Sequence, residues 1–415
     1  MNMKKIKYLI LLFLILPIMV RASDTVNFKV GNRFFESFFE AYQYASLDNP
    51  LIILNDINFD DTLNINKSIV INLNNHDISS PRMVFKLDGG TLNLTGKGTV
   101  RERTPYYGAV VIKGSETNQA DYSILNVSSD VTLEGWTGIF IDQKNKKAYG
   151  VKVNSNAKIN ALNDTSGDSG IGIYVNGQIK DPVNAPEINL GSNSYIKSTG
   201  PGIYLAGYST LNVDGYIEGI DSGLSLKSGI ININGGTIKA TGPDNTPTSP
   251  NGNGTNSSGA GIQIESNNSY AGNIELTIND GNIISENGYS FYEFTATPST
   301  NTKVKNINIL NGTFTSLKNN FLLSDSFKTT HPKFISGGKF TSDVSPYLKT
   351  GSLSHNDNYY QVVSKNFDNI KDLTISKKNL LPIIIIITFL IVLLINLYLY
   401  TRKKLLKKRI SKFIL

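Results

Sequence analysis

Few side chains in this 415-residue chain could support metal or nucleophilic chemistry. Cys is absent, which excludes disulfides, thiolate-bound zinc, iron–sulfur clusters and thiol nucleophiles. With only three His residues in total, His76, His331 and His355, we do not expect a multi-histidine metal centre. We therefore expect no cofactor, and the candidate chemistry rests on carboxylates and aromatic rings.

Two local groups of carboxylates stand out. Asp60 and Asp61 are adjacent, but Asp pairs are common in turns and we do not expect this one to be catalytic. Asp164 and Asp168 enclose a Thr-Ser-Gly corner. A Ca²⁺ ion needs about six to eight oxygen ligands, and this spacing departs from that of an EF-hand loop. Asp164 and Asp168 are thus weak metal candidates, and a solvated turn is the alternative reading.

One short phrase recurs along the middle of the chain. An apolar, a polar and an apolar residue are followed within a few positions by Gly or Asn and a further apolar residue, as in Leu92-Asn93-Leu94 with Gly98 and Val100. The third residues of the copies are Leu73, Leu94, Val127, Val153, Leu190, Val213, Ile233, Ile278, Ile309 and Ile335. A second phrase, Gly followed by apolar-x-apolar, lies between the copies and begins at Gly138, Gly172, Gly202, Gly223 and Gly261.

These phrases predict an all-β solenoid. Each repeat supplies at least two short strands with period-2 alternation, separated by Gly or Asn corners. A single coil cannot bury its inward apolar row, whereas stacked coils bury it continuously. Irregular spacing of the copies favours a right-handed parallel β-helix over a strict prism. About eleven coils would give a stack roughly 50 Å long. The competing fold is a β-sandwich or a string of immunoglobulin-like domains.

Outward positions of the two phrases provide the candidate binding surface. The first row carries almost only amides, Asn72, Asn93, Asn126, Lys152, Asn189, Asn212, Asn232, Thr277 and Asn308, which favours side-chain amide ladders. The second row begins with Phe140, Tyr174 and Tyr204, and Trp136 and Tyr208 could extend it. Stacked on successive coils, these five rings are a candidate glycan platform. The alternative is a purely structural aromatic ladder.

Neither row contains Asp or Glu, although hydrolysis of a glycosidic bond usually needs two carboxylates about 5–10 Å apart. We therefore expect no enzyme activity. A polysaccharide lyase or glycoside hydrolase on the same fold remains the alternative. Residues 241–259 are rich in Gly, Ser, Thr, Asn and Pro and cannot pack a core, so they form a tolerated insertion or a binding loop.

Both ends of the chain have the features of targeting segments. Lys4, Lys5 and Lys7 precede a 13-residue apolar stretch, and Val20 and Ala22 fit a cleavage site, which predicts a secretory signal peptide over residues 1–22. An uncleaved anchor is the alternative. Near the other end, the 21 residues 380–400 carry no charge and are followed by seven basic residues between 402 and 412. This pattern predicts one transmembrane helix with a cytoplasmic tail and an extracellular main domain.

The charge is segregated in the same way. The first 22 residues carry +4 and residues 377–415 carry +9, which leaves −6 of the total of +7 for residues 23–376. A mildly acidic middle offers no general field for phosphate backbones, so we expect no nucleic-acid partner.

Together these features predict the domain organisation. Phe34–Tyr42 has the spacing of an amphipathic helix and would cap the first coil. The segments are a signal peptide (1–22), an N-terminal cap with this helix (23–50), the parallel β-helix (51–342), a C-terminal closure and juxtamembrane stalk (343–378), a transmembrane helix (379–400) and a basic cytoplasmic tail (401–415).

The chain also resembles a group of bacterial proteins. The stretches Ile69–Ser79 and Gly89–Gly96, and the ending Ile335–Leu348, resemble Gram-positive cell-surface proteins with a pectate-lyase-like β-helix. The resemblance covers about residues 30–363. It implies an envelope-attached adhesin or glycan-contacting module and supplies no active site. We therefore expect a single-pass surface protein of the cell membrane that contacts glycans or host matrix without catalysis. A passive envelope spacer is a further alternative.

Overall fold

The computed structural model describes residues 26–363, except 106, 163–166, 248–253, 297–298 and 357, together with the single residues 393, 394, 398 and 402. The chain divides into two units, residues 1–363 and 364–415. Because only four residues of the second unit are described, the fold that follows is that of the first.

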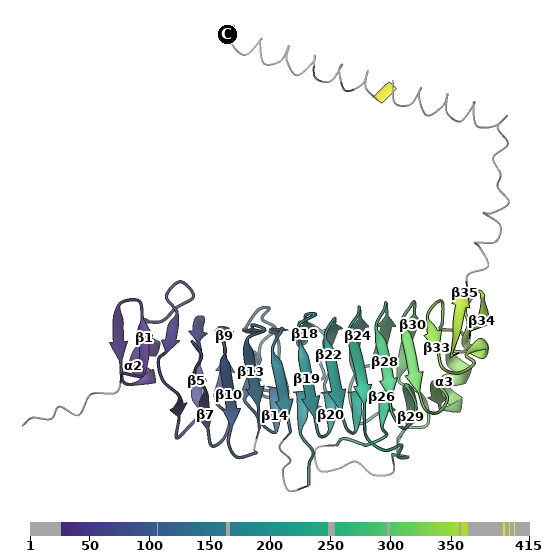
Figure 1. Ribbon diagram of the computed structural model, residues 1–415, viewed down its shortest axis with the longest axis horizontal. Coiled ribbons are helices and arrows are strands. Elements are labelled where there is room, and N and C mark those ends of the chain that lie inside the picture. Colours follow the sequence, from purple (N-terminus) through teal and green to yellow (C-terminus); the bar gives the residue numbers. More distant parts are fainter. Residues whose placement is uncertain are drawn as a thin grey trace, which may run out of the picture. The chain divides into compact units, whose positions relative to one another are not determined.

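Three long sheets build the first unit (Figure 1). Sheet A contains, in spatial order, β2 (Arg33–Phe35), β1 (Phe28–Val30), β3 (Leu51–Ile53), β6 (Ile69–Asn72), β9 (Gly90–Thr95), β12 (Ser123–Val127), β15 (Val151–Ser155), β18 (Glu187–Leu190), β21 (Thr210–Val213), β24 (Gly229–Ile233), β27 (Ile274–Ile278) and β30 (Val304–Ile309).

Sheet B contains β4 (Ile57–Asn58), β7 (Ile78–Ser80), β10 (Gly98–Glu102), β13 (Val131–Glu134), β16 (Lys158–Ala161), β19 (Tyr195–Ser198), β22 (Tyr216–Gly219), β25 (Thr237–Ala240), β28 (Asn282–Ser285), β31 (Thr313–Ser316), β33 (Lys339–Phe340), β35 (Tyr359–Val363) and β34 (Ser352–Asn356). Sheet C contains β5 (Leu63–Ile65), β8 (Phe85–Asp88), β11 (Val110–Lys113), β14 (Thr137–Asp142), β17 (Ile171–Val175), β20 (Pro201–Leu205), β23 (Ser222–Leu226), β26 (Ala260–Ser266), β29 (Phe291–Thr295) and β32 (Phe321–Leu323).

Each coil contributes one strand to each sheet. Between β3 and β32, strands that are three places apart along the chain pair in parallel, as β9, β12 and β15 do in sheet A. Antiparallel strand pairs among the described residues occur only at the two ends. This order confirms the predicted parallel β-solenoid, because a sandwich would join neighbouring strands by hairpins.

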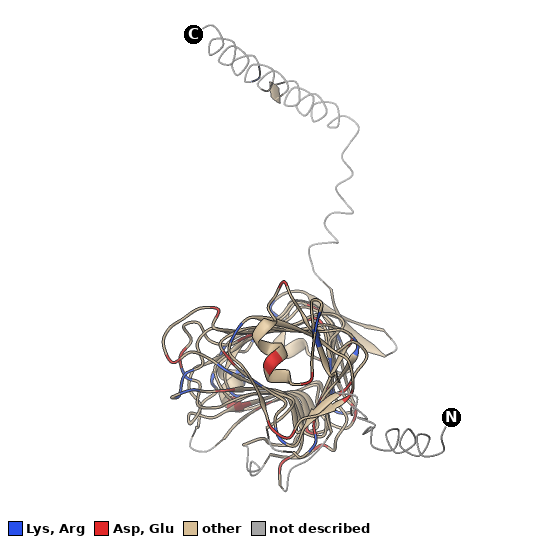
Figure 2. Cartoon of the chain, turned by 90° about the vertical axis from the view of Figure 1, so that its left-hand side faces the viewer, with Lys and Arg blue, Asp and Glu red and all other residues tan. Residues whose placement is uncertain are grey.

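The interior of the coils is apolar. In sheet A one inward row runs through Leu92, Leu125, Val153, Ile188, Leu211, Ile231, Leu276 and Ile307, each at most 2% exposed. Figure 2, a view along the stack, shows the coils superimposed around a common centre. Burying each apolar side chain of the inward row contributes about 1.5–3 kcal/mol, and the neighbouring coil completes that burial.

The Gly that opens the second phrase has a packing role. Gly138, Gly172, Gly202, Gly223 and Gly261 follow one another on successive strands of sheet C, and a Cβ on any of them would lie 2.2–3.0 Å from the Cγ2 of an Ile in sheet B. Only a residue without a side chain lets the two sheets approach this closely. The repeated Gly therefore fixes the corner between sheets B and C.

Two copies of the first phrase are out of register with the rest. Ile71, not Leu73, pairs with Leu94, and Val153 pairs with Leu125 instead of Val127. Both slips are two residues long. Because side chains alternate with period 2, such a slip leaves every side chain on its predicted face and cannot be detected from the apolar pattern.

The N-terminal cap helix is shorter than expected. It spans α2 (Phe38–Tyr44), whereas Phe34 and Phe35 belong to strand β2. β2 pairs with β1, and β1 pairs with β3 at the edge of sheet A, so backbone hydrogen bonding extends the first coil. The predicted helix is therefore correct from Phe38 onwards and wrong for Phe34 and Phe35, because pairing with a sheet edge overrides local periodicity.

The C-terminal end is closed by elements that the repeat did not predict. Helix α3 (Asp325–Thr330) and the 3₁₀ turn η1 (Ser345–Tyr347) lie between β32 and β34. Five buried Phe rings pack against one another there, Phe314, Phe321, Phe327, Phe334 and Phe340. Glu293, 1% exposed, accepts hydrogen bonds from the backbone N and the Oγ of Ser324, the residue that caps α3.

Several predicted segments lie outside the described residues. These are the signal peptide (1–22), most of the stalk, and nearly all of the predicted transmembrane helix (379–400) and basic tail (401–415). Among the residues that are described, no helix has the length and hydropathy needed to span a bilayer.

Candidate functional site

The aromatic row forms a continuous stack on the outer face of sheet C. Phe140 pairs with Tyr174, and Tyr174 with Tyr204, on adjacent strands, as the phrase predicted. Ring centroids are 4.8 and 5.1 Å apart, with interplanar angles of 21° and 17°. Tyr107, from the loop before β11, adds a fourth ring 5.6 Å from Phe140. Further along the same row lie Ser225, Gln263 and Tyr292.

Most of this stack is covered. Phe140, Tyr204 and Trp136 are at most 6% exposed, and each inner ring uses both of its faces on its neighbours. The row is therefore not the open platform suggested by the sequence. Tyr174 remains half-buried. Tyr208, also half-buried, packs against the loop at Gly272 and not on the stack.

Trp136 packs against the edge of the stack. Its ring meets that of Tyr174 edge-on at 6.4 Å, and its Nε1 donates to the Ser169 carbonyl at 3.0 Å. Burial raises the pKa values of Tyr174 and Tyr204 well above the usual value for tyrosine. Both phenols are thus neutral and can act as hydrogen-bond donors at physiological pH.

A second outward row, two residues further along the same strands, carries the charges. It runs through Asp88, Lys113, Asp142, Asn176, Ala206, Lys227 and Glu265. Lys113 pairs with Asp142 at 3.0 Å, and Asp142 also accepts a hydrogen bond from Asn176 at 3.1 Å. Sequence analysis missed this row. Reading two positions beyond each aromatic residue would have found it, since residues i and i+2 share a face.

Two hollows open beside the aromatic stack. The larger, about 490 Å³, lies where the small side chain of Ala206 interrupts the charged row, and it is lined by Tyr174, Asn176, Gly177, Gln178, Lys180, Ala206, Ser269 and Tyr270. The smaller, about 160 Å³, lies at the other end of the stack and is lined by Met83, Lys86, Tyr107, Val111, Lys113 and Asp142. Both are lined largely by amide, hydroxyl and charged groups around an aromatic ring.

A third hollow, about 800 Å³, lies at the N-terminal end against α2. Its lining combines five rings with eight polar residues, Asn27, Glu36, Ser37, Gln43, Thr62, Asn64, Asn66 and Lys67. It is the space between the cap helix and the first coil.

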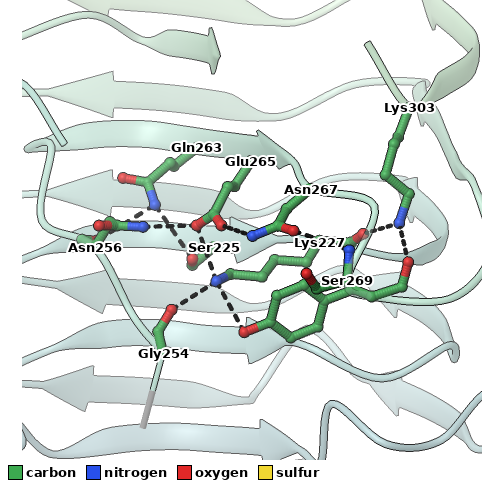
Figure 3. Close-up of polar contacts among 10 residues, drawn as sticks. Ser225, Lys227, Gly254, Asn256, Gln263, Glu265, Asn267, Ser269 and Lys303 are labelled. Atoms are coloured by element: carbon green, nitrogen blue, oxygen red, sulfur yellow. Dashed lines mark hydrogen bonds and ion pairs between the residues drawn. The ribbon is translucent and has the colours of Figure 1, made fainter. Parts of the chain in front are cut away.

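A buried polar cluster adjoins the larger hollow (Figure 3). Lys227 follows β23 and pairs with Glu265 of β26 at 2.9 Å, with both side chains at most 2% exposed. Lys227 Nζ also donates to the Gly254 carbonyl at 2.6 Å and to Tyr270 Oη at 3.2 Å. We call Lys227, Glu265, Asn256 and Tyr270 the Lys227 cluster. No sequence motif marked it, because its members come from different coils.

Comparisons with known proteins do not identify the chain. No family model matches it, and neither does any curated protein or solved structure. The resemblance to Gram-positive surface proteins therefore remains an inference from the quoted stretches.

The remaining predicted candidates stay separate. Asp164 lies outside the described residues, and Asp168 is half-buried on the following loop. Within the described parts of the chain, no group of three His, Asp or Glu side chains could hold a metal ion. Asp61 Oδ1 accepts a hydrogen bond from the Thr62 backbone at 2.7 Å, an arrangement typical of a turn.

The amide row forms the predicted ladder with one change of member. Each Asn donates from Nδ2 to Oδ1 of the preceding one, at 2.7–3.0 Å, through Asn93, Asn126, Asn154, Asn189, Asn212 and Asn232. Asn154 occupies the position predicted for Lys152, and Asn72 pairs with Thr95 outside the row. The ladder thus uses one donor and one acceptor of each interior amide.

Proposed function

We propose that this protein is a cell-surface carbohydrate-contacting module that binds without catalysis, through the outer face of sheet C. The observation that carries the proposal is the pair of polar hollows flanking one aromatic stack on a continuous sheet. Carbohydrate sites combine aromatic contacts with amide and hydroxyl groups that match sugar hydroxyls.

The larger hollow supplies these groups. Asn176, Gln178 and Ser269 offer donors and acceptors, Lys180 offers a cation, and Tyr174 and Tyr270 offer ring edges with phenol hydroxyls. The smaller hollow lies about two strand spacings away on the same face, roughly 10 Å. A linear glycan lying along the stack would contact both.

The other parts of the proposal rest on the sequence and on general rules of topology. Parallel crossover connections are right-handed in almost all proteins, which favours a right-handed coil. The apolar stretch and basic tail near the C-terminus favour a single membrane span with this domain outside the cell, and the first 22 residues favour secretion.

A glycan array tests the proposal. We expect the purified full-length protein to bind a subset of glycans, and the double variant Gln178→Ala/Lys180→Ala to bind them roughly fivefold or more weakly, since each lost hydrogen bond costs about 0.5–1.5 kcal/mol. Both side chains are exposed, so the fold should tolerate the change. Lys158→Ala, an exposed lysine on sheet B, is the matched control. Absence of glycan binding contradicts the proposal, and unchanged affinity in the double variant contradicts the site.

A polysaccharide-active enzyme is the alternative function. Its candidate carboxylates are Asp88 and Asp142, two strands apart in the charged row, at a separation of roughly 10 Å. Both already have partners, however, since Tyr122 donates to Asp88 and Lys113 pairs with Asp142. Turnover of any polysaccharide by the full-length protein would favour this alternative.

A further inference from the structure

Two buried side chains converge on one carboxylate oxygen of a third in the Lys227 cluster (Figure 3). Glu265 Oε2 lies 2.9 Å from Lys227 Nζ and 2.6 Å from Asn256 Nδ2. Lys227 follows β23, Glu265 lies near the end of β26, and Asn256 belongs to the insertion that joins β25 to β26. An amine, an amide and a carboxylate that are distant in sequence therefore meet at a single atom.

The surroundings of this group exclude water. Lys227 and Glu265 are 1% exposed, and Asn256 is 5% exposed. The rings of Tyr204 and Tyr270 lie over Lys227 Nζ, with centroids at 5.5 and 4.4 Å. Burying an ion pair costs desolvation that its attraction barely repays, and an amine beside a neutral acid avoids that cost. Lys227 Nζ and Glu265 Oε2 therefore meet in a buried contact of 2.9 Å.

We propose that Lys227 and Asn256 become joined by an amide bond inside the folded protein, with Glu265 as the proton carrier. Nζ gives a proton to Glu265 Oε2, and its lone pair then attacks Asn256 Cγ while the carbonyl electron pair moves to Oδ1. Glu265 passes the proton to Nδ2, the Cγ–Nδ2 bond breaks, and the carbonyl reforms. The extra proton on Nζ then passes to the ammonia that has left, so ammonium is released and Glu265 is regenerated.

The geometry suits this sequence of proton transfers. The nucleophile Nζ and the leaving nitrogen Nδ2 contact the same oxygen, so a single carboxylate can serve as base and then as acid. The Asn256 backbone is held as well, because Gln263 Nε2 donates to its carbonyl at 3.3 Å. No oxidant, metal or cofactor is needed, since the reaction exchanges one amide nitrogen for another.

Two neighbouring groups are poorer reactants. Asn267 donates to the other oxygen of Glu265, Oε1, at 2.9 Å and is only half-buried. Lys303 Nζ donates to the backbone carbonyls of Lys227 and Tyr270 and not to Glu265. The structure therefore assigns the bond to Lys227 and Asn256.

The bond would fix the end of the insertion to sheet C. Asn256 lies 29 positions after Lys227, and the cross-link would close that length of chain into a loop. Closing a loop reduces the freedom of the unfolded chain, which stabilises the folded one. It would also hold the insertion in place beside Tyr204.

Peptide mapping of the purified full-length protein tests the proposal. Trypsin cannot cleave after an acylated lysine, so we expect residues 198–239, uncut at Lys227, to be linked to residues 240–303, with a combined mass lower by one ammonia. Fragmentation of the linked peptides locates the acceptor. Mapping is needed in addition to the intact mass, because cyclisation at an Asn-Gly pair, such as Asn251-Gly252, releases ammonia too.

Matched variants separate the cross-link from a simple ion pair. Glu265→Gln and Asn256→Ala should each restore the free peptide ending at Lys227, whereas Asn267→Ala should keep the link. The wild-type map decides the question even where a variant fails to fold. Complete cleavage after Lys227 in folded wild-type protein would overturn the proposal, and a link to Asn267 would overturn the assignment to Asn256.

Discussion

Individual residues of this protein stabilise the stack through their neighbours on adjacent coils. In the Asn ladder each interior side chain donates one hydrogen bond to one neighbour and accepts one from the other. Each such bond contributes about 0.5–1.5 kcal/mol, less where the groups are partly exposed. In the aromatic stack, rings on adjacent coils contact one another in the same way, and each pair contributes about 0.5–1.5 kcal/mol beyond its buried area.

Lys303 is the residue with the clearest expected pH dependence. It is 8% exposed, and burial lowers its pKa to about 8, an effect opposed by Glu265 and reinforced by Lys227. Between about pH 8 and pH 10, Lys303 is neutral in the folded chain but protonated in the unfolded chain. The unfolded state then binds more protons, so the contribution of Lys303 to stability increases with pH over this range.

Chemical unfolding between pH 7 and pH 10 measures this effect. We expect wild-type stability to increase with pH relative to that of Lys303→Met, which has no group to titrate. Lys305→Met removes an exposed lysine two residues away and corrects for the general loss of one charge. Parallel pH profiles for wild type and Lys303→Met would contradict the expectation.

At the scale of strands, the corner between sheets B and C is the most sensitive contact. Gly172 shows it well, because a Cβ there would lie 2.2 Å from Ile196 Cγ2 and 2.4 Å from the carbonyl oxygen of Gly202. We expect Gly172→Ala to lower the free energy of unfolding by about 1–3 kcal/mol, since neither the neighbouring backbone nor a buried Ile can move aside cheaply. Thermal or denaturant unfolding of the full-length protein measures the loss.

Gly235→Ala is the matched control for this change. Gly235 lies at a turn of the same solenoid, where a Cβ would meet only Asp214 Oδ1 at 3.8 Å. The substitution should be neutral or slightly stabilising, because Ala reduces the freedom of the unfolded chain. Equal effects of the two substitutions on the free energy of unfolding would show that the close contact between sheets B and C does not require Gly.

At the scale of the whole solenoid, the two ends must be covered. A parallel stack leaves unpaired strand edges at both ends, and such edges promote association with other chains. Here β1 and β2 with α2 cover one end, while α3, η1 and the β34–β35 hairpin cover the other. The two hydrogen bonds that Ser324, the cap of α3, donates to Glu293 join the C-terminal closure to the last complete coil.

Truncation tests the role of the C-terminal closure. We expect a chain ending at Leu323 to self-associate, because it would expose the edges of β30, β31 and β32 and the rings of Phe314 and Phe321. A chain ending at Val363 keeps the closure and is the control. Light scattering on both proteins measures the outcome, and a monomeric, folded chain ending at Leu323 would show that the closure is dispensable.

The sequence by itself determined the β-solenoid, the inward apolar rows, the Gly positions and the stacking of Phe140, Tyr174 and Tyr204. It could do so because period-2 alternation and a repeated phrase act locally, and stacking copies of one phrase brings equivalent residues together. Only the tertiary structure decided the two-residue register slips, the burial of the aromatic stack and the meeting of Lys227, Asn256 and Glu265. A slip of two residues keeps every side chain on its face, while burial depends on loops and insertions that carry no repeat.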